Sequence, residues 1–161
     1  MRLIVMGVAG SGKTTLGVAT AQELDAIFID ADDLHPEDNI SHMSSGKPLT
    51  DEMRWPWLDA CGAALRDHDR IVLGCSALRR SYRDHLRTFA PDARLVYPRV
   101  TEDMIRERFK RRTGHFMPER LINSQFRTLE PPTIDENPIL APATLPVQRA
   151  AKLVASIVLA K

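Results

Sequence analysis

Eight consecutive residues near the start of the chain have the types and spacing needed to hold a polyphosphate. They follow an apolar run at residues 3–6 and are Gly7, Val8, Ala9, Gly10, Ser11, Gly12, Lys13 and Thr14. The glycines let successive backbone N–H groups turn toward a polyphosphate without a Cβ clash. A helix that begins here favours the anion, Lys13 can reach the β- and γ-phosphates, and the Thr14 hydroxyl can ligate Mg²⁺.

We therefore predict a nucleoside triphosphate site, and we also assign Thr15, the next residue of the helix, to it. The alternative is a glycine-rich turn that binds nothing. That alternative is disfavoured, because the motif is preceded by a strand pattern and followed by a helix pattern.

A pair of carboxylates follows the second apolar run. Residues 26–29 are apolar, and Asp30 and Asp32 come directly after them. Ligands of an open parallel sheet bind at the carboxyl ends of its strands, so these side chains are expected beside the phosphate loop. Asp30 is predicted to order a Mg²⁺-bound water, and Asp32 to accept the proton of a substrate hydroxyl. The alternative is an acidic turn in which Asp32 or Asp33 caps the next short helix, and Asp30 is also a candidate cap.

Basic residues in the second half of the chain predict a lid. Arg108, Arg112 and His115 are spaced i, i+4 and i+7, which places them on one face of a helix and the turn after it. Guanidinium groups there would offset charge that develops on a transferred phosphoryl group. We place the lid at roughly residues 108–128, with Arg108 and Arg112 at the nucleotide and Arg112 also catalytic. A solvated basic helix face is the alternative.

Further arginines could bind an acidic substrate group. Ser76 follows a third apolar run, and Arg79 and Arg83 share a helix face that begins at the same strand end. Arg54 and Arg80 are additional candidates. Arginine suits bidentate recognition of a carboxylate, but spacing alone does not separate such residues from ordinary surface charge.

Short apolar runs alternate with amphipathic segments, as in a parallel sheet covered by helices on both faces. Strands are expected at residues 2–6, 26–29, 70–75, 94–97 and 138–141. Helices are expected at residues 13–24, 57–65, 78–89, 102–113, 118–129 and 147–158. Thr50 and Thr101 can cap two helices, Gly114 can end one and Pro118 can begin one. We expect one α/β domain over residues 1–161.

Composition excludes several classes of partner. Lys and Arg number 22 and Asp and Glu 21, so the chain has no large net positive charge that would indicate binding to nucleic acid or to an anionic membrane. The two cysteines, Cys61 and Cys75, form no metal-spaced cluster. The first apolar run is too short to span a membrane and lacks the layout of a signal peptide. A reduced, cytoplasmic protein is expected.

Longer strings along the chain resemble one family. In order they are GVAGSGKT, DADDLHPEDN, GKPLTDEMRWPWL, CSALRRSYRDHLR and GHFMPERLINSQFRTLEPP. This order is similar to the gluconate kinases (gluconokinases) of the shikimate-kinase-like and nucleoside-monophosphate-kinase-like group, over residues 3 to about 137. The resemblance implies a three-layer P-loop kinase fold with strand order 2-3-1-4-5, a mobile lid and a homodimer. It also implies that ATP, with Mg²⁺, phosphorylates the 6-hydroxyl of D-gluconate.

The resemblance also implies roles for single residues. Asp32 matches the carboxylate at the substrate hydroxyl, and Arg112 matches a lid arginine of the nucleotide site. Residues assigned to the sugar acid are His35, Arg54, Ser76, Arg83, His115 and Gln125.

Three departures from the family pattern stand out. Ala31 replaces a usual glycine, Met53 replaces an acidic residue that would pair with Arg54, and residues 140–146 lack acidic character near the adenine.

Two other functions remain open. One is a related small-molecule kinase acting on shikimate or a nucleotide. The other is a nucleotide-dependent switch that does not phosphorylate anything. A GTPase switch would need an Asn-Lys-x-Asp motif, which this sequence does not contain.

Overall fold

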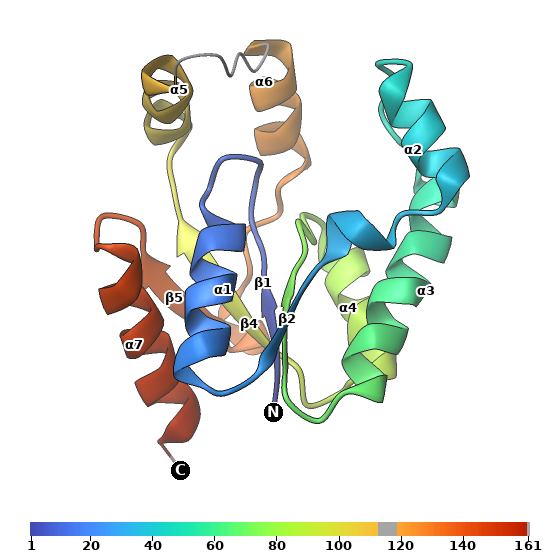
Figure 1. Cartoon of the computed structure of the whole chain (residues 1–161). Coiled ribbons are helices and arrows are strands. Elements are labelled where there is room, and N and C mark those ends of the chain that lie inside the picture. Colours follow the sequence, from blue (N-terminus) through green and yellow to red (C-terminus); the bar gives the residue numbers. More distant parts are fainter. Residues whose placement is uncertain (113–118, 161) are drawn as a thin grey trace.

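A parallel sheet forms the centre of the computed structural model, which describes residues 1–112 and 119–160. The strands are β1 (Arg2–Val5), β2 (Ile27–Asp30), β3 (Ile71–Gly74), β4 (Arg94–Arg99) and β5 (Ile139–Pro142). They lie in the order β2-β3-β1-β4-β5, which confirms the predicted order (Figure 1). The register aligns Gly74 with Val5 on one side and with Asp30 on the other. The segments that follow these three strands therefore leave the sheet at one edge, side by side.

Helices cover both faces of the sheet (Figure 1). Helices α1 (Lys13–Glu23) and α7 (Val147–Leu159) pack on one face, and α3 (Asp51–Asp67) and α4 (Arg80–Phe89) on the other. Side chains alternate along each strand, so Leu3 and Val5 of β1 face α1 and α7, whereas Ile4 faces α3 and α4. Both faces are buried, which explains why the strand sequences are apolar without a polar alternation.

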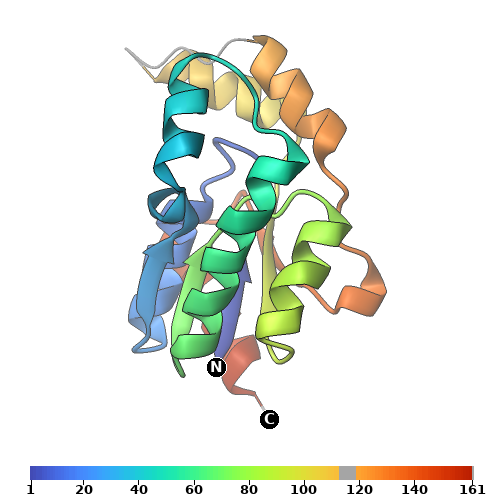
Figure 2. The same ribbon diagram turned by 90° about the vertical axis from the view of Figure 1, so that its right-hand side faces the viewer.

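The remaining helices stand at the edge where the strands end. They are α2 (Glu37–Ser44), α5 (Glu102–Arg111), α6 (Glu119–Thr128) and the 3₁₀ turn η1 (Ala31–Leu34). A second 3₁₀ turn, η2 (Ile134–Glu136), precedes β5 and lies beside α4. Figures 1 and 2 place α2 and the α5–α6 pair at the same end of the molecule as the loop between β1 and α1, and the N-terminus at the other end. A separate apolar cluster, comprising Val8, Leu78, Val100, Ile105 and Ile122, joins that loop to α5 and α6.

Most predicted helix boundaries are confirmed. Thr50 caps α3 by accepting from the backbone N–H of Met53 at 3.3 Å, and Thr101 caps α5 by accepting from Met104 at 3.2 Å. Helix α5 ends at Arg111, three residues before the predicted stop at Gly114. Gly114 and Pro118 lie outside the described residues.

Two other expectations differ from the structure. Helix α4 begins at Arg80 rather than at residue 78, because the backbone of Arg79 is extended, with φ −95° and ψ 147°, outside the helical region. Ile157, whose i+3 spacing from Val154 predicts a place on the inward face of this helix, is 38% exposed near the end of α7.

Both cysteines are buried in the cluster beneath α3 and α4. Cys61 of α3 is 0% exposed and Cys75, directly after β3, is 1% exposed, and neither is in a disulfide. A hydrogen bond with Cys75, together with burial, raises the pKa of the Cys61 thiol. Among the described residues, no helix is long and apolar enough to cross a bilayer.

Candidate active site

The loop between β1 and α1 is shaped by three glycines with positive φ. Gly7, Gly10 and Gly12 have φ angles of 142°, 80° and 86°. A Cβ added to Gly10 would lie 2.7 Å from the ring of Phe109 on α5, so this position also lacks space for a side chain. Helix α1 starts at Lys13, directly after the loop, and the N–H groups of its first residues have no partner within the helix. Positive φ angles at these positions and a helix that starts directly after them are the features that a concave set of N–H donors requires.

Three N–H groups of the loop are hydrogen-bonded, two of them to groups outside it. Gly7 donates to the carbonyl of Ser76 at 3.1 Å, and Ser11 donates to the carbonyl of Val8 at 3.1 Å. Ala9 donates to the side-chain oxygen Oε1 of Gln125 on α6, also at 3.1 Å. The loop is therefore held by β3's carboxyl end on one side and by α6 on another.

Asp30 has two roles at the end of β2. Its Oδ1 accepts from the backbone N–H of Asp32 at 3.0 Å and so caps η1. Its Oδ2 accepts from the Thr14 hydroxyl at 3.3 Å. The capping alternative is thus confirmed for Asp30 and wrong for Asp32 and Asp33, because α2 begins after Pro36.

A hydroxyl and a carboxylate are hard oxygen ligands, and Mg²⁺ usually takes only one or two of these from the protein. In the described ranges no cluster of three or more His, Cys, Asp or Glu side chains could hold a metal. The pair of Thr14 and Asp30 fits a magnesium ion whose other ligands would be phosphate oxygens and water.

Asp32 lies exposed in η1, one hydrogen bond away from Asp30. Its negative charge acts on His35, at the end of the same turn: burial lowers the pKa of the imidazole, and the field of Asp32 raises it by less. The net pKa of His35 is below its ordinary value, so this side chain is neutral at physiological pH.

The ring of His35 is fixed by two neighbours. It stacks on Trp57 with ring centroids 4.4 Å apart, and its Nδ1 lies 3.2 Å from Nδ2 of Asn39. Asn39 Nδ2 can only donate, so Nδ1 is the acceptor and the proton of the neutral ring is on Nε2. Trp57 in turn donates to the carbonyl of Ala31 at 2.7 Å. The replacement of glycine by Ala31 is accommodated, because this residue is part of η1 and is not among the positive-φ residues of the described chain.

Arg54 belongs to a polar cluster between α3 and α4. Its Nη1 donates to Asp51 at 3.2 Å and to the hydroxyl of Tyr82 at 3.1 Å, and the Tyr82 hydroxyl donates to Asp51 at 2.5 Å. Arg79 Nη1 lies 3.7 Å from Asp51. The hydrogen bond from Tyr82 is the main reason that the pKa of Asp51 is lowered. The ion pair that Met53 cannot form is therefore supplied by Asp51, one helical turn earlier.

Arg83 does not contact a substrate site, and its assignment to the sugar acid is wrong. The side chain is 1% exposed and forms a bidentate pair with Glu136 of η2, with Nε–Oε1 at 2.7 Å and Nη2–Oε2 at 2.9 Å. Its Nη1 donates to the carbonyls of Ala77 and Leu78 at 3.0 and 3.2 Å. Arg83 is a structural residue that fixes the turn between β3 and α4.

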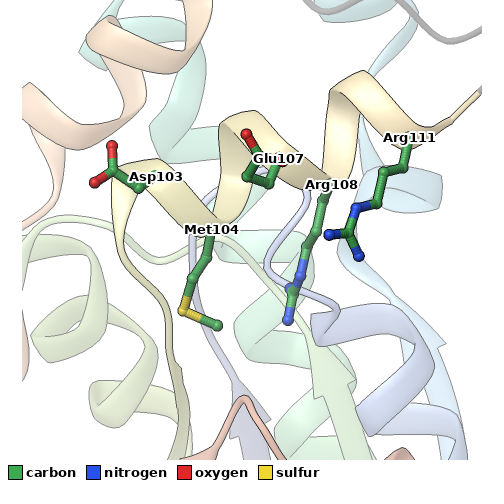
Figure 3. Close-up of a pocket in the computed structure, with 5 residues that line it drawn as sticks. All are labelled: Asp103, Met104, Glu107, Arg108 and Arg111. Atoms are coloured by element: carbon green, nitrogen blue, oxygen red, sulfur yellow. The ribbon is translucent and has the colours of Figure 1, made fainter.

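Two of the arginines at and after the C-terminal end of α5 differ in their surroundings. Arg108 donates from Nη1 to the carbonyl of Gly10 at 3.0 Å and from Nη2 to Ala143 at 3.4 Å. Arg112 lies exposed just after the helix, with extended backbone, so it does not continue the helical face of Arg108. A pocket of about 330 Å³ is lined by five residues of α5. Figure 3 shows Met104, Arg108 and Arg111 extending from one side of this helix.

The other predicted residues have mixed outcomes. Gln125 contacts the phosphate loop, and Ser76 reaches it through its backbone carbonyl. Lys13 lies at the start of α1, partly exposed. His115 lies outside the described residues.

Sequence reasoning missed Asp51 and Tyr82 as partners of Arg54. The i, i+3 spacing of Asp51 and Arg54 was an available signal, whereas the contact with Tyr82 joins residues 28 apart.

Comparisons with known proteins agree with this geometry. A family model described as an AAA domain matches residues 3–132. The thermosensitive gluconokinase of Escherichia coli K12 is 45% identical over 141 residues, which cover 85% of this chain and 75% of that protein. The crystal structure of a gluconokinase from Sinorhizobium meliloti 1021 superposes with a TM-score of 0.89 at 42% identity, covering 96% of this chain and 89% of the other. Shikimate kinase from Aquifex aeolicus shares the fold, with a TM-score of 0.62 at 15% identity.

The sheet order, the phosphate loop and the polar strand ends define a P-loop kinase fold. Within that class, the identity and coverage of these relatives are decisive. The chain belongs to the gluconokinase family.

Proposed function

We propose that this protein transfers the γ-phosphoryl group of ATP to the 6-hydroxyl of D-gluconate. The observation that carries the proposal is the contact between Thr14, at the phosphate loop, and Asp30, one hydrogen bond from Asp32. This contact places the phosphate loop and Asp32, the candidate base, at the same edge of the sheet. The names of the relatives supply the substrate, since they are gluconokinases.

The nucleotide would lie along the loop and beneath α5. Backbone N–H groups at the start of α1 and the Lys13 ammonium would hold the phosphates. Arg108, which already contacts the loop at Gly10, and Arg112 would approach the same phosphates from α5. The pocket on α5 would take the base, with Met104 as an apolar surface.

Thr14 and Asp30 would hold magnesium, directly or through a bound water. The ion would neutralise negative charge on the β- and γ-phosphates and so assist transfer. All other steps depend on side chains of this chain.

The acceptor would enter between η1 and the cluster around Arg54. Asp32 would orient the attacking hydroxyl and take its proton. His35 presents an Nε2–H donor suited to a polyol hydroxyl, and Arg54 with Arg79 would bind the carboxylate. Ser76 and His115 stay assigned to the substrate as expectations.

Closure of a lid at roughly residues 108–128 would exclude water, which would otherwise take the phosphoryl group. The homodimer implied by the family resemblance is part of the same proposal, and light scattering tests it.

A substrate panel combined with one variant tests the function. Phosphorylation should be far faster with gluconate than with shikimate or nucleoside monophosphates. Asp32→Asn should lower kcat by about 10²-fold or more, the usual scale for a general base, while ADP binding persists. Asp33→Asn is the matched control, because Asp33 is the next, exposed residue of the same turn. Unchanged kcat in Asp32→Asn would remove the base, and ATP turnover indifferent to any acceptor would favour a switch.

A further inference from the structure

Gln125 was expected at the sugar acid, but its contact in the structure is with the phosphate loop. Its Oε1 accepts the N–H of Ala9 at 3.1 Å, across 116 residues of sequence. Ala9 is the third residue of the loop, and Gln125 lies on α6 in the predicted lid. This side chain therefore joins the lid to the cradle.

The bonded N–H groups of the loop alternate along its sequence. Gly7 and Ala9 donate to groups outside the loop, and Ser11 donates to Val8 within it. Gly10, between Ala9 and Ser11, and Gly12, after Ser11, have the positive φ angles that allow neighbouring N–H groups to form a concave set. The contact with Gln125 thus fixes the N–H of Ala9 next to Gly10, where the loop turns.

Several contacts attach helix α6 to the loop, to α5 and to the segment before α4. Ile122 is 4% exposed in the cluster that contains Val8 of the loop. Arg106 of α5 donates to Asn123 of α6 at 2.6 Å. Beyond the helix, the backbone N–H of Glu130 donates to Leu78 at 2.8 Å.

The carboxylate of Glu130 accepts from the backbone N–H of Arg80, at the start of α4, at 2.7 Å. Side chains on both sides of Gln125, in the helix and after it, are thus tied to the body of the protein.

We propose that Gln125 is a positioning residue for the nucleotide, not a ligand of the sugar acid. It keeps the phosphate loop in its binding shape by accepting the Ala9 N–H. The expectation for gluconate rests on the proposed function. The expectation for nucleotide binding does not depend on it. Without the acceptor oxygen, the Ala9 N–H is left unpaired in a partly buried place, and the loop loses its attachment to α6.

Replacing Gln125 with methionine tests the proposal. Gln125→Met retains the length of the side chain and removes the acceptor. We expect KM for ATP and Kd for ADP to rise about tenfold, the scale of one lost hydrogen bond, with KM for gluconate within about twofold of the original. Arg127→Met is the matched control on the same helix, since Arg127 is exposed and its replacement leaves the attachments of α6 intact. It should leave both constants unchanged.

A rise in KM for gluconate alone would overturn the inference and restore the substrate role, and so would unchanged constants. If Gln125→Met does not fold, Gln125→Ala should likewise raise KM for ATP and Kd for ADP and leave KM for gluconate within about twofold of the original. If the native protein phosphorylates no sugar acid, the proposed function fails. The Kd for ADP in Gln125→Met would then still decide whether this residue supports the loop.

Discussion

The buried pair of Arg83 and Glu136 gives the sharpest test of the structure. In Arg83→Met, the Glu136 carboxylate stays buried without its bidentate partner, and two carbonyls lose a donor. Removing one member of a buried pair costs about 3–5 kcal/mol. The lower end applies, because Arg87 Nη1 and Arg80 Nε remain 3.6 and 3.9 Å from Glu136 Oε1. A loss of about 3 kcal/mol corresponds to a fall in Tm of roughly 6–12 °C for a chain of this size.

Thermal unfolding followed by circular dichroism measures this change, with kinase assays run well below the lowered Tm. KM for gluconate should stay within about twofold of the original, because Arg83 is sealed from solvent. The double variant Arg83→Met/Glu136→Leu should recover about half of the lost stability, since the uncompensated charge is gone. An unchanged Tm with a large rise in KM for gluconate would refute the reasoning and restore Arg83 to the substrate site.

Three further predictions concern the acid side, the loop and the acceptor site. Burial tends to raise the pKa of Glu136, but hydrogen bonds from Arg83 and from the backbone prevail and lower it. The contribution of Glu136 to the free energy of unfolding should therefore be complete above about pH 4.3, the ordinary pKa of glutamate. It should decline as the pH falls through the lower pKa of the folded state. A Glu136→Gln variant, measured by urea unfolding, should lack this decline. Gly10→Ala should raise KM for ATP about tenfold or more, because its Cβ would clash with Phe109. Gly46→Ala is the control, since Gly46 has a similar φ but open space around it, and it should leave KM for ATP unchanged. Equal effects of the two substitutions would contradict the steric argument. Tyr82→Phe removes a hydrogen bond to Arg54 and should raise KM for gluconate about fivefold in steady-state assays, with KM for ATP unchanged. An unchanged KM for gluconate would show that the cluster around Arg54 is not part of the acceptor site.

Local patterns were sufficient to predict much of the fold and part of the site. The phosphate loop is contiguous in sequence, and its glycines report backbone angles directly, so Gly10 and Gly12 could be assigned without coordinates. The strand order came from the family resemblance, and the structure has the same order. Thr50 and Thr101 were correctly placed as caps, because a cap depends only on the next three residues.

Residues whose partners are distant in sequence could not be placed. Spacing put Arg83 on a helix face together with Arg79, and nothing local showed that Glu136, 53 residues later, neutralises it. Gln125 presented the same problem, because its partner Ala9 belongs to the other end of the chain. Arg54 was partly predictable, since Asp51 lies one turn before it, but its contact with α4 depends on how two helices pack.

The two sulfur atoms beneath the site have a practical consequence. Only a thiolate reacts readily with alkylating reagents, and both Cys61 and Cys75 are enclosed, with the Cys61 proton held more tightly than usual. Labelling of either thiol therefore requires α3 to separate from β3. The rate at which a maleimide is consumed thus reports how often that half of the protein opens, without any engineered probe.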